Sequence, residues 1–134
     1  MADYTGTNAN IQWVHAGGTA VLSTDYRSVS VNPSIGLADT TAGADTDKTY
    51  IATIKDTTIE YAGLMQAGGT VIKAALAAGV GGTLILSSEG TASGKPKESY
   101  PAIAMGAKML YPYDNVVEIT CSFQKNGAVA ETSW

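Results

Sequence analysis

Residues 116–124 read VVEITCSFQ, and apolar and polar side chains alternate along this stretch after its first residue. Successive side chains of an extended strand point to opposite faces, so this alternation predicts a strand with one buried and one polar face. The buried face would hold Val117, Ile119, Cys121 and Phe123. The polar face would hold Glu118, Thr120, Ser122 and Gln124.

Upstream, the sequence predicts a hairpin and a second alternating strand. A strand is expected at 9–16 (ANIQWVHA), and Gly17-Gly18 supplies the turn because both positions can adopt positive φ. The return strand is expected to continue through 27–32 (RSVSVN), where Val29 and Val31 alternate with polar residues. Pro33 should end the ladder by removing a hydrogen-bond donor.

The rest of the chain predicts further strands and one helix. Strands are expected at 49–61, with a bulge or kink at 56–58, and at 82–88 and 102–110, separated by turn-rich segments at 89–99, 111–115 and 125–127. The helix is expected at about 70–78, where Thr70 can cap its start and Gly79 suits its end. Its apolar stripe is interpreted as core packing: Val71, Ile72, Ala75 and Leu76.

About seven strands and one flanking helix predict a mainly β sandwich or barrel. The 134 residues form a single predicted domain, 1–134, since no repeat or composition break divides them. Residues 34–48 (SIGLADTTAGADTDK) show no periodicity and are expected to form a long loop. Structureless loops of this length are uncommon in compact domains and are usually functional or disordered.

The composition favours a chain whose surface is covered by neighbours. Charged residues make up 15% of the chain, against about a quarter in a typical protein, and 45% of residues are apolar. The net charge is −4 and the basic residues are scattered, which argues against wrapping nucleic acid. A mildly acidic surface repels DNA instead, a useful property in a channel that DNA must traverse.

No constellation of residues indicates catalysis, a cofactor or a metal. His15 is the only histidine and lies on the apolar face of a predicted strand, and Cys121 is the only cysteine and alternates into a core face. The glycines of 79–82 follow the predicted helix, whereas a phosphate loop precedes one. The aspartates of 39–47 lack the central glycine and closing glutamate of a calcium loop.

The N-terminal residues show neither the basic region nor the apolar core of a signal peptide, and no apolar stretch approaches the roughly 20 residues of a membrane helix. We therefore expect synthesis and folding in a cytoplasm, with no membrane partner.

Two stretches, 27–56 and 115–134, carry a resemblance to the major tail (tail tube) proteins of long-tailed bacteriophages. The second is the more telling, with VEITCSFQ followed by a glycine turn and a terminal Trp134. The order of elements resembles this family over most of the chain. The resemblance implies a small β-sandwich or barrel flanked by a helix, six copies of which close into a ring, with rings stacked into a hollow tube.

The resemblance also implies partners and a location. Copies of the chain would bind one another, a tape-measure protein and other tail proteins, and DNA would pass through the tube without specific binding. The protein would be assembled in the bacterial host cytoplasm and end in the virion tail. No cofactor or catalytic residue is implied.

Mapped onto this sequence, the resemblance implies that the 34–48 loop reaches a neighbouring subunit or ring. The candidate interface residues are Asp39, Thr40, Thr41, Asp45, Asp47, Lys48 and Trp134. Glu60 and Glu118 alternate against apolar neighbours and are candidates for the face that lines the lumen. The alternative for both glutamates is a solvated outer face.

Two other structural or binding roles stay open. The tube of a contractile phage-like secretion device has the same implied architecture. A small β-barrel module could instead bind a ligand or glycan, with a pocket lined by Trp13, Tyr61, Tyr100, Tyr111 and Tyr113. An enzyme is a third functional class, but the sequence offers no candidate set of catalytic residues for it.

Overall fold

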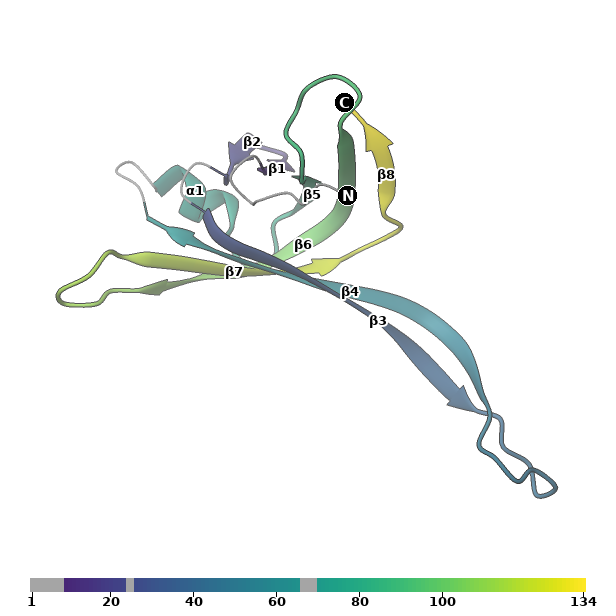
Figure 1. Cartoon of the computed structure of the whole chain (residues 1–134). Helices are drawn as coiled ribbons and strands as arrows, with labels where there is room; N and C mark the ends of the chain where they lie inside the picture. Colours follow the sequence, from purple (N-terminus) through teal and green to yellow (C-terminus); the bar gives the residue numbers. More distant parts are fainter. Residues whose placement is uncertain (1–8, 24–25, 66–69) are drawn as a thin grey trace.

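The computed structural model describes residues 9–23, 26–65 and 70–134. It contains eight strands in one antiparallel sheet, ordered β2-β1-β5-β6-β7-β4-β3, with β8 paired to β6 (Figure 1). The strands are β1 (Asn10–His15), β2 (Gly18–Val21), β3 (Tyr26–Asp39), β4 (Tyr50–Leu64), β5 (Gly81–Ser87), β6 (Pro96–Leu110), β7 (Glu118–Lys125) and β8 (Ala130–Ser133), with helix α1 (Thr70–Ala75) between β4 and β5. The mainly β prediction with one flanking helix is confirmed.

Strand β6 lets this single sheet fold into two layers. Its first half pairs with β5 over residues 98–103, and its second half pairs with β7 over residues 102–110. The register shifts between Ala104 and Ala107, where Gly106 has a φ of 107° that an L side chain rarely adopts. The upper layer in Figure 1 holds β2, β1 and β5, and the lower layer holds β7, β4 and β3.

Large apolar side chains from both layers meet in the core. Trp13 of β1 and Phe123 of β7 are fully buried, with ring centroids 4.8 Å apart. Leu84, Ile59 and Ile119 complete the centre of this cluster. The alternation in 116–124 is therefore confirmed, because its apolar residues from Ile119 onward are all buried.

Helix α1 is shorter than predicted and packs on one end of the core. The Trp13 Nε1–H donates a hydrogen bond of 2.9 Å to the Ala75 carbonyl oxygen, and Ala75 and Leu76 are buried. After Ala75 the chain continues in tight turns, and Gly79, with a φ of 89°, donates its N–H to Ala104 at 2.8 Å. The predicted helix end at Gly79 is therefore wrong, although Gly79 does adopt the expected positive φ. The side chains of Val71 and Ile72 lie outside the described residues.

The predicted hairpin is present, but the prediction that its second strand continues through 27–32 is wrong. β1 and β2 pair with His15 opposite Gly18, so the turn residues are Ala16 and Gly17. The expected return strand through 27–32 is a separate strand, β3, at the opposite end of the sheet order. Alternation identifies a strand but not its partner, which is why the sequence could not separate β2 from β3.

The predicted loop at 34–48 is only partly correct, because its first six residues, 34–39, belong to a strand. β3 continues to Asp39 and β4 begins at Tyr50, so only 40–49 connects them. Pro33 stays within the ladder opposite Thr57, because β3 is an edge strand and tolerates a missing donor. The expected irregularity at 56–58 lies further along the hairpin, where the register shifts between Ile35 and Leu37.

Residues 33–57 form a free-standing two-stranded ribbon, called the arm below, because β7 pairs with β4 only from Thr58 onward. Figure 1 shows the arm extending well away from the two layers. Eight residues of β4, Tyr50–Thr57, belong to it, which corresponds to about 26 Å of strand. A Cβ at Gly36 would clash with the Thr53 side-chain hydroxyl, so a larger residue at this position in the bulge would require Thr53 to move.

Candidate assembly surfaces

The tip of the arm has a defined hydrogen-bonded shape. Asp39 accepts a hydrogen bond of 2.8 Å from the Thr41 N–H, and hydrogen bonds from the Thr41 side chain and backbone lower the pKa of the Asp39 carboxyl. The hydroxyls of Thr40 and Thr49 lie 2.8 Å apart, and the Thr49 N–H donates to the Thr41 hydroxyl at 3.0 Å. Threonine and aspartate thus shape the turn, as they do in Asx and ST turns.

The other predicted tip residues lie on the same short connection. The Asp45 carboxylate accepts a hydrogen bond of 2.8 Å from the Ala42 N–H, and the Asp45 N–H donates to the Ala42 carbonyl at 2.9 Å. Asp47 and Lys48 are exposed beside this turn. The structure therefore brings six of the seven candidate interface residues to one end of the molecule.

Trp134 lies apart from that cluster. It follows β8 and packs against its own subunit, where its Nε1–H donates to the Ser87 hydroxyl at 2.9 Å. Its backbone N–H donates to the Lys95 carbonyl, and the Lys97 ammonium lies 4.5 Å from the ring centroid. In the subunit, Trp134 holds the C-terminal strand against the loop that precedes β6.

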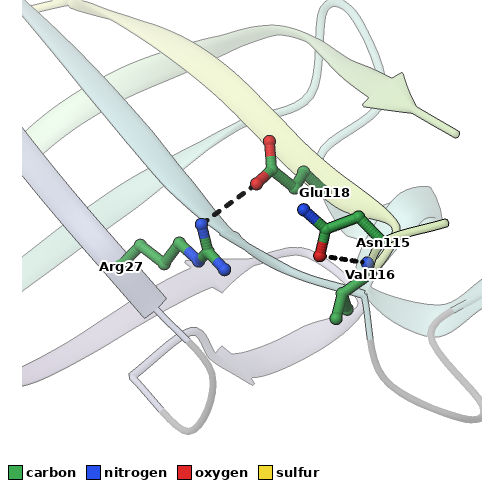
Figure 2. Close-up of polar contacts among 4 residues, drawn as sticks. All are labelled: Arg27, Asn115, Val116 and Glu118. Carbon is green, nitrogen blue, oxygen red and sulfur yellow. Dashed lines mark hydrogen bonds and ion pairs between the residues drawn. The ribbon is translucent and has the colours of Figure 1, made fainter. Parts of the chain in front are cut away.

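Glu60 and Glu118 share the polar face of the β4 and β7 layer. Glu60 is exposed and pairs across the strands with Ser30 and Ser122. Glu118 accepts an ion-paired hydrogen bond of 3.1 Å from Arg27, which reaches over β4 (Figure 2). Beside this pair, the Asn115 side-chain oxygen accepts from the Val116 N–H at 2.8 Å (Figure 2).

This polar face is rich in hydroxyl groups. A shallow hollow on it is lined from four strands by Ser28, Ser30, Glu60, Lys108, Thr120 and Ser122, together with backbone and small residues. The opposite face of the same layer packs on the core. The two predicted lumen residues therefore do lie on one common surface.

Two strand edges of this layer carry no β partner in the part of the chain that the structure describes. The outer side of β3 is one edge of the sheet. On the other side of the layer, β5 covers β6 only as far as Ile103, and residues 105–110 of β6 extend beyond it. Open edges invite pairing with another strand, so a stable surface must cover or pair them.

Exposed apolar side chains gather on two protrusions. Five lie on the arm: Ile35, Leu37, Tyr50, Ile51 and Ile54. Four lie on the turn between β6 and β7, residues 110–116, called the aromatic turn below: Leu110, Tyr111, Tyr113 and Val116. Sequence reasoning missed both. The signals were available, since YPYDNV carries three large apolar side chains in a turn and YIATI places them on both faces of a strand.

The five aromatic residues of the ligand-pocket alternative do not come together in the structure. Trp13, Tyr61 and Tyr100 are buried, whereas Tyr111 and Tyr113 are exposed, so the five aromatics line no common pocket. Over the described ranges, His, Cys, Asp and Glu side chains form no group of three placed to hold a metal ion. No described helix has the length and apolar character needed to span a membrane.

The surroundings of His15 and Cys121 are consistent with structural roles for both side chains. The His15 Nδ1 accepts a hydrogen bond of 3.1 Å from the Gly17 N–H in the first turn. Burial raises the pKa of the Cys121 thiol to about 11, so the side chain is a neutral thiol near neutral pH.

Searches against protein-family models and curated proteins gave no match. Solved structures do match. A chain from the tail of an empty gene transfer agent particle with C6 symmetry has a TM-score of 0.71 at 10% identity, over 98% of this chain and 100% of that one. This chain has a tail-tube fold. The SPP1 tail tube gives a TM-score of 0.70 at 10% identity, over 98% of this chain and 80% of that one. A chain of the sheath–tube complex of an extracellular contractile injection system gives 0.69 at 9% identity, over 98% and 93%.

Proposed function

We propose that this chain is a structural, non-catalytic subunit whose copies close into rings, and that the rings stack into the hollow tail tube of a phage-like particle. The observation that carries the proposal is the layer β6-β7-β4-β3, which ends in two open edges. A monomer with both edges exposed would be prone to uncontrolled pairing, whereas a ring pairs every edge.

The strand directions suit such a ring. Each neighbouring pair in the layer is antiparallel, so three reversals separate β3 from β6 and the two edge strands run in opposite directions. Rotation about the ring axis leaves the direction of each strand relative to that axis unchanged, so every copy presents the same two edge directions. When β3 of one copy meets β6 of the next, the pair is antiparallel, and the same ladder continues around the ring.

Six copies fit the channel that the proposal needs. The similar gene transfer agent tail has C6 symmetry. Four strands from each of six copies would give a barrel of about 24 strands, and barrels of roughly 16 strands already leave an aqueous channel. The core-facing side of the layer is covered by β1 and β5, so the hydroxyl-rich side faces the lumen.

In this arrangement Glu60 faces the lumen, and Glu118 lies there paired with Arg27. Exposed hydroxyls and a net charge of −4 give DNA few positive groups to bind. Copies of the chain are the first partners, and a tape-measure protein in the lumen and other tail proteins are the next. Assembly in the bacterial host cytoplasm and a final place in the virion tail belong to the same proposal.

The arm supplies the contact between rings in this proposal. Its tip residues, including Asp39, Asp45 and Asp47, lie far from the body and would meet a subunit of a neighbouring ring. Trp134 is proposed to act at an interface through the C-terminal strand that it anchors. The tube of a contractile device is the second candidate, since one similar structure is a sheath–tube complex.

Electron microscopy of the purified chain tests the proposal. We expect rings and hollow tubes at high concentration, and a protein that stays monomeric would overturn it. The matched variant replaces residues 36–54 with Asn-Gly, a two-residue hairpin turn that joins the paired residues Ile35 and Lys55. This variant should fold and still form rings, but should not form tubes.

A further inference from the structure

The arm and the aromatic turn leave the molecule at opposite ends of the same layer. In the pairing of β4 with β7, Thr58 lies opposite Gln124 and Leu64 lies opposite Glu118. The arm joins the layer at Thr58, and the aromatic turn joins it just before Glu118. Figure 1 shows the two protrusions pointing in different directions from the body. One end of each subunit therefore presents the arm and the other presents the turn.

These two protrusions hold most of the exposed apolar surface. Nine of the twelve large apolar residues that are exposed in the described part of the chain lie on them. Ile54 in the bulge of the arm is 83% exposed, and Tyr113 in the middle of the turn is fully exposed. Within the described residues the subunit covers neither group. Soluble proteins rarely gather exposed apolar side chains in this way unless another molecule covers them.

We propose that the aromatic turn of one copy receives the arm of a second copy in the next ring. This inference rests on the proposed tube function and names the contact that stacks its rings. Rings stacked with one polarity always present opposite ends to each other, so the arm end of one ring faces the turn end of the next. The contact is heterologous and does not close on itself, which is the geometry that extends into a filament.

The strand geometry gives the contact enough reach. About 26 Å of ribbon extends beyond the layer, so an arm passes the near edge of the next ring and runs alongside its subunits. The aromatic turn of the next ring lies at its near edge. It therefore meets the middle of the arm, and the tip of the arm reaches further along that ring. Ile35, Leu37 and Ile54 lie in this middle part.

Removing the aromatic side chains of the turn tests this contact. Within the subunit, the Tyr111 hydroxyl donates an exposed hydrogen bond of 3.4 Å to the Met109 sulfur, which contributes little to the fold. The variant Tyr111→Ser/Tyr113→Ser should therefore fold and form rings, while the concentration needed for tubes rises at least tenfold. The control is Val21→Ser, which removes an exposed apolar side chain from β2 and should form tubes as wild type does.

The outcomes separate this inference from the tube proposal. If wild type and the double variant form tubes at the same concentration, the turn is not the acceptor and the tube function stands. If wild type forms neither rings nor tubes, the tube function itself fails and this inference fails with it.

Cysteine cross-linking identifies the partner directly. Ile54→Cys and Tyr113→Cys subunits are mixed, assembled and mildly oxidised, and the native Cys121 is buried and stays out of the reaction. Covalent dimers should form in the mixture and not in either variant alone. Val21→Cys mixed with Ile54→Cys should give none. Dimers within each single variant, with no additional product in the mixture, would indicate like-to-like contacts and overturn the inference.

Discussion

Strand β4 passes through two different environments, and the contrast between them separates folding from assembly. In the body, Ile59 of β4 is fully buried in the core cluster and is paired with β3 on one side and β7 on the other. In the arm, Ile54 lies five residues earlier on the same strand and is 83% exposed. Both segments are paired with β3, although Ile54 itself lies in the bulge of the arm. The difference lies in what covers the side chains.

This difference indicates that the body stabilises the subunit, and it supports the proposal that the arm contacts another molecule. A two-stranded ribbon is at best marginally stable in water without a third strand or a packed face. The apolar side chains of the arm contribute little to the fold of a single copy. In the proposed tube, a second copy covers them.

Replacing the two isoleucines with alanine should give the largest contrast. Ile59→Ala is expected to lower the free energy of unfolding by about 2–5 kcal/mol, because it leaves a cavity in the core. Ile54→Ala should change it by about 0.5 kcal/mol or less, as is usual for exposed sites. Urea unfolding of the unassembled subunit measures both. Equal losses would show that the arm is packed in the single copy.

The reactivity of cysteine thiols should also differ between the body and the arm. Burial raises the pKa of Cys121 to about 11, so its labelling at pH 8 should be on the order of 100-fold slower than that of a cysteine in the arm, Ile54→Cys. Labelling with a chromogenic disulfide, with and without denaturant, measures the two rates. Fast labelling of Cys121 in the folded subunit would contradict its burial.

The same thiol gives a pH dependence. The folded state holds the Cys121 proton to higher pH than the unfolded state, in which a thiol titrates near pH 8.5. The unfolded state therefore binds fewer protons between about pH 8.5 and 11, and the stability of wild type should fall across this window. Cys121→Ala should lose less stability over the same range in urea unfolding.

One tyrosine in the body and one in the arm should show the same contrast, with a smaller change in the free energy of unfolding. The Tyr61 hydroxyl donates a buried hydrogen bond of 3.0 Å to the Leu22 carbonyl oxygen, which ties β4 to the end of β2. Tyr61→Phe should cost about 1–2 kcal/mol, since the carbonyl loses its donor. Tyr50→Phe on the exposed arm should be neutral in thermal unfolding. A neutral Tyr61→Phe would show that this bond contributes nothing to the body.

The smallest expected effect concerns the ion pair on the polar face. Arg27 and Glu118 have side chains that are 54% and 31% exposed, so their pairing should contribute about 0.2–1 kcal/mol and weaken in high salt. A double-mutant cycle with Arg27→Gln and Glu118→Gln, measured at low and at 1 M salt, gives the value. A larger, salt-insensitive coupling would mean that the pair is shielded in the single subunit.

Much of the fold was predictable because period-2 alternation reports local burial directly. The strand around Ile119 to Phe123, the hairpin after His15 and the start of the helix near Thr70 all followed from local patterns. The arm residues from Asp39 to Lys48 were also identified, although as part of a longer loop. These features depend on a few neighbouring residues, and the sequence by itself determines them.

Tertiary structure decided the rest. Whether Pro33 ends a strand depends on whether that strand is at an edge, and whether β2 continues into β3 depends on which partners each strand finds. The stretch YPYDNV gave a local signal for the exposure of Tyr113, whereas the exposure of Leu37 depends on the fold, because an apolar residue in a strand can be either buried or exposed. Only the folded chain shows that the arm and the aromatic turn lie at opposite ends of one layer, since pairing between distant strands sets that placement.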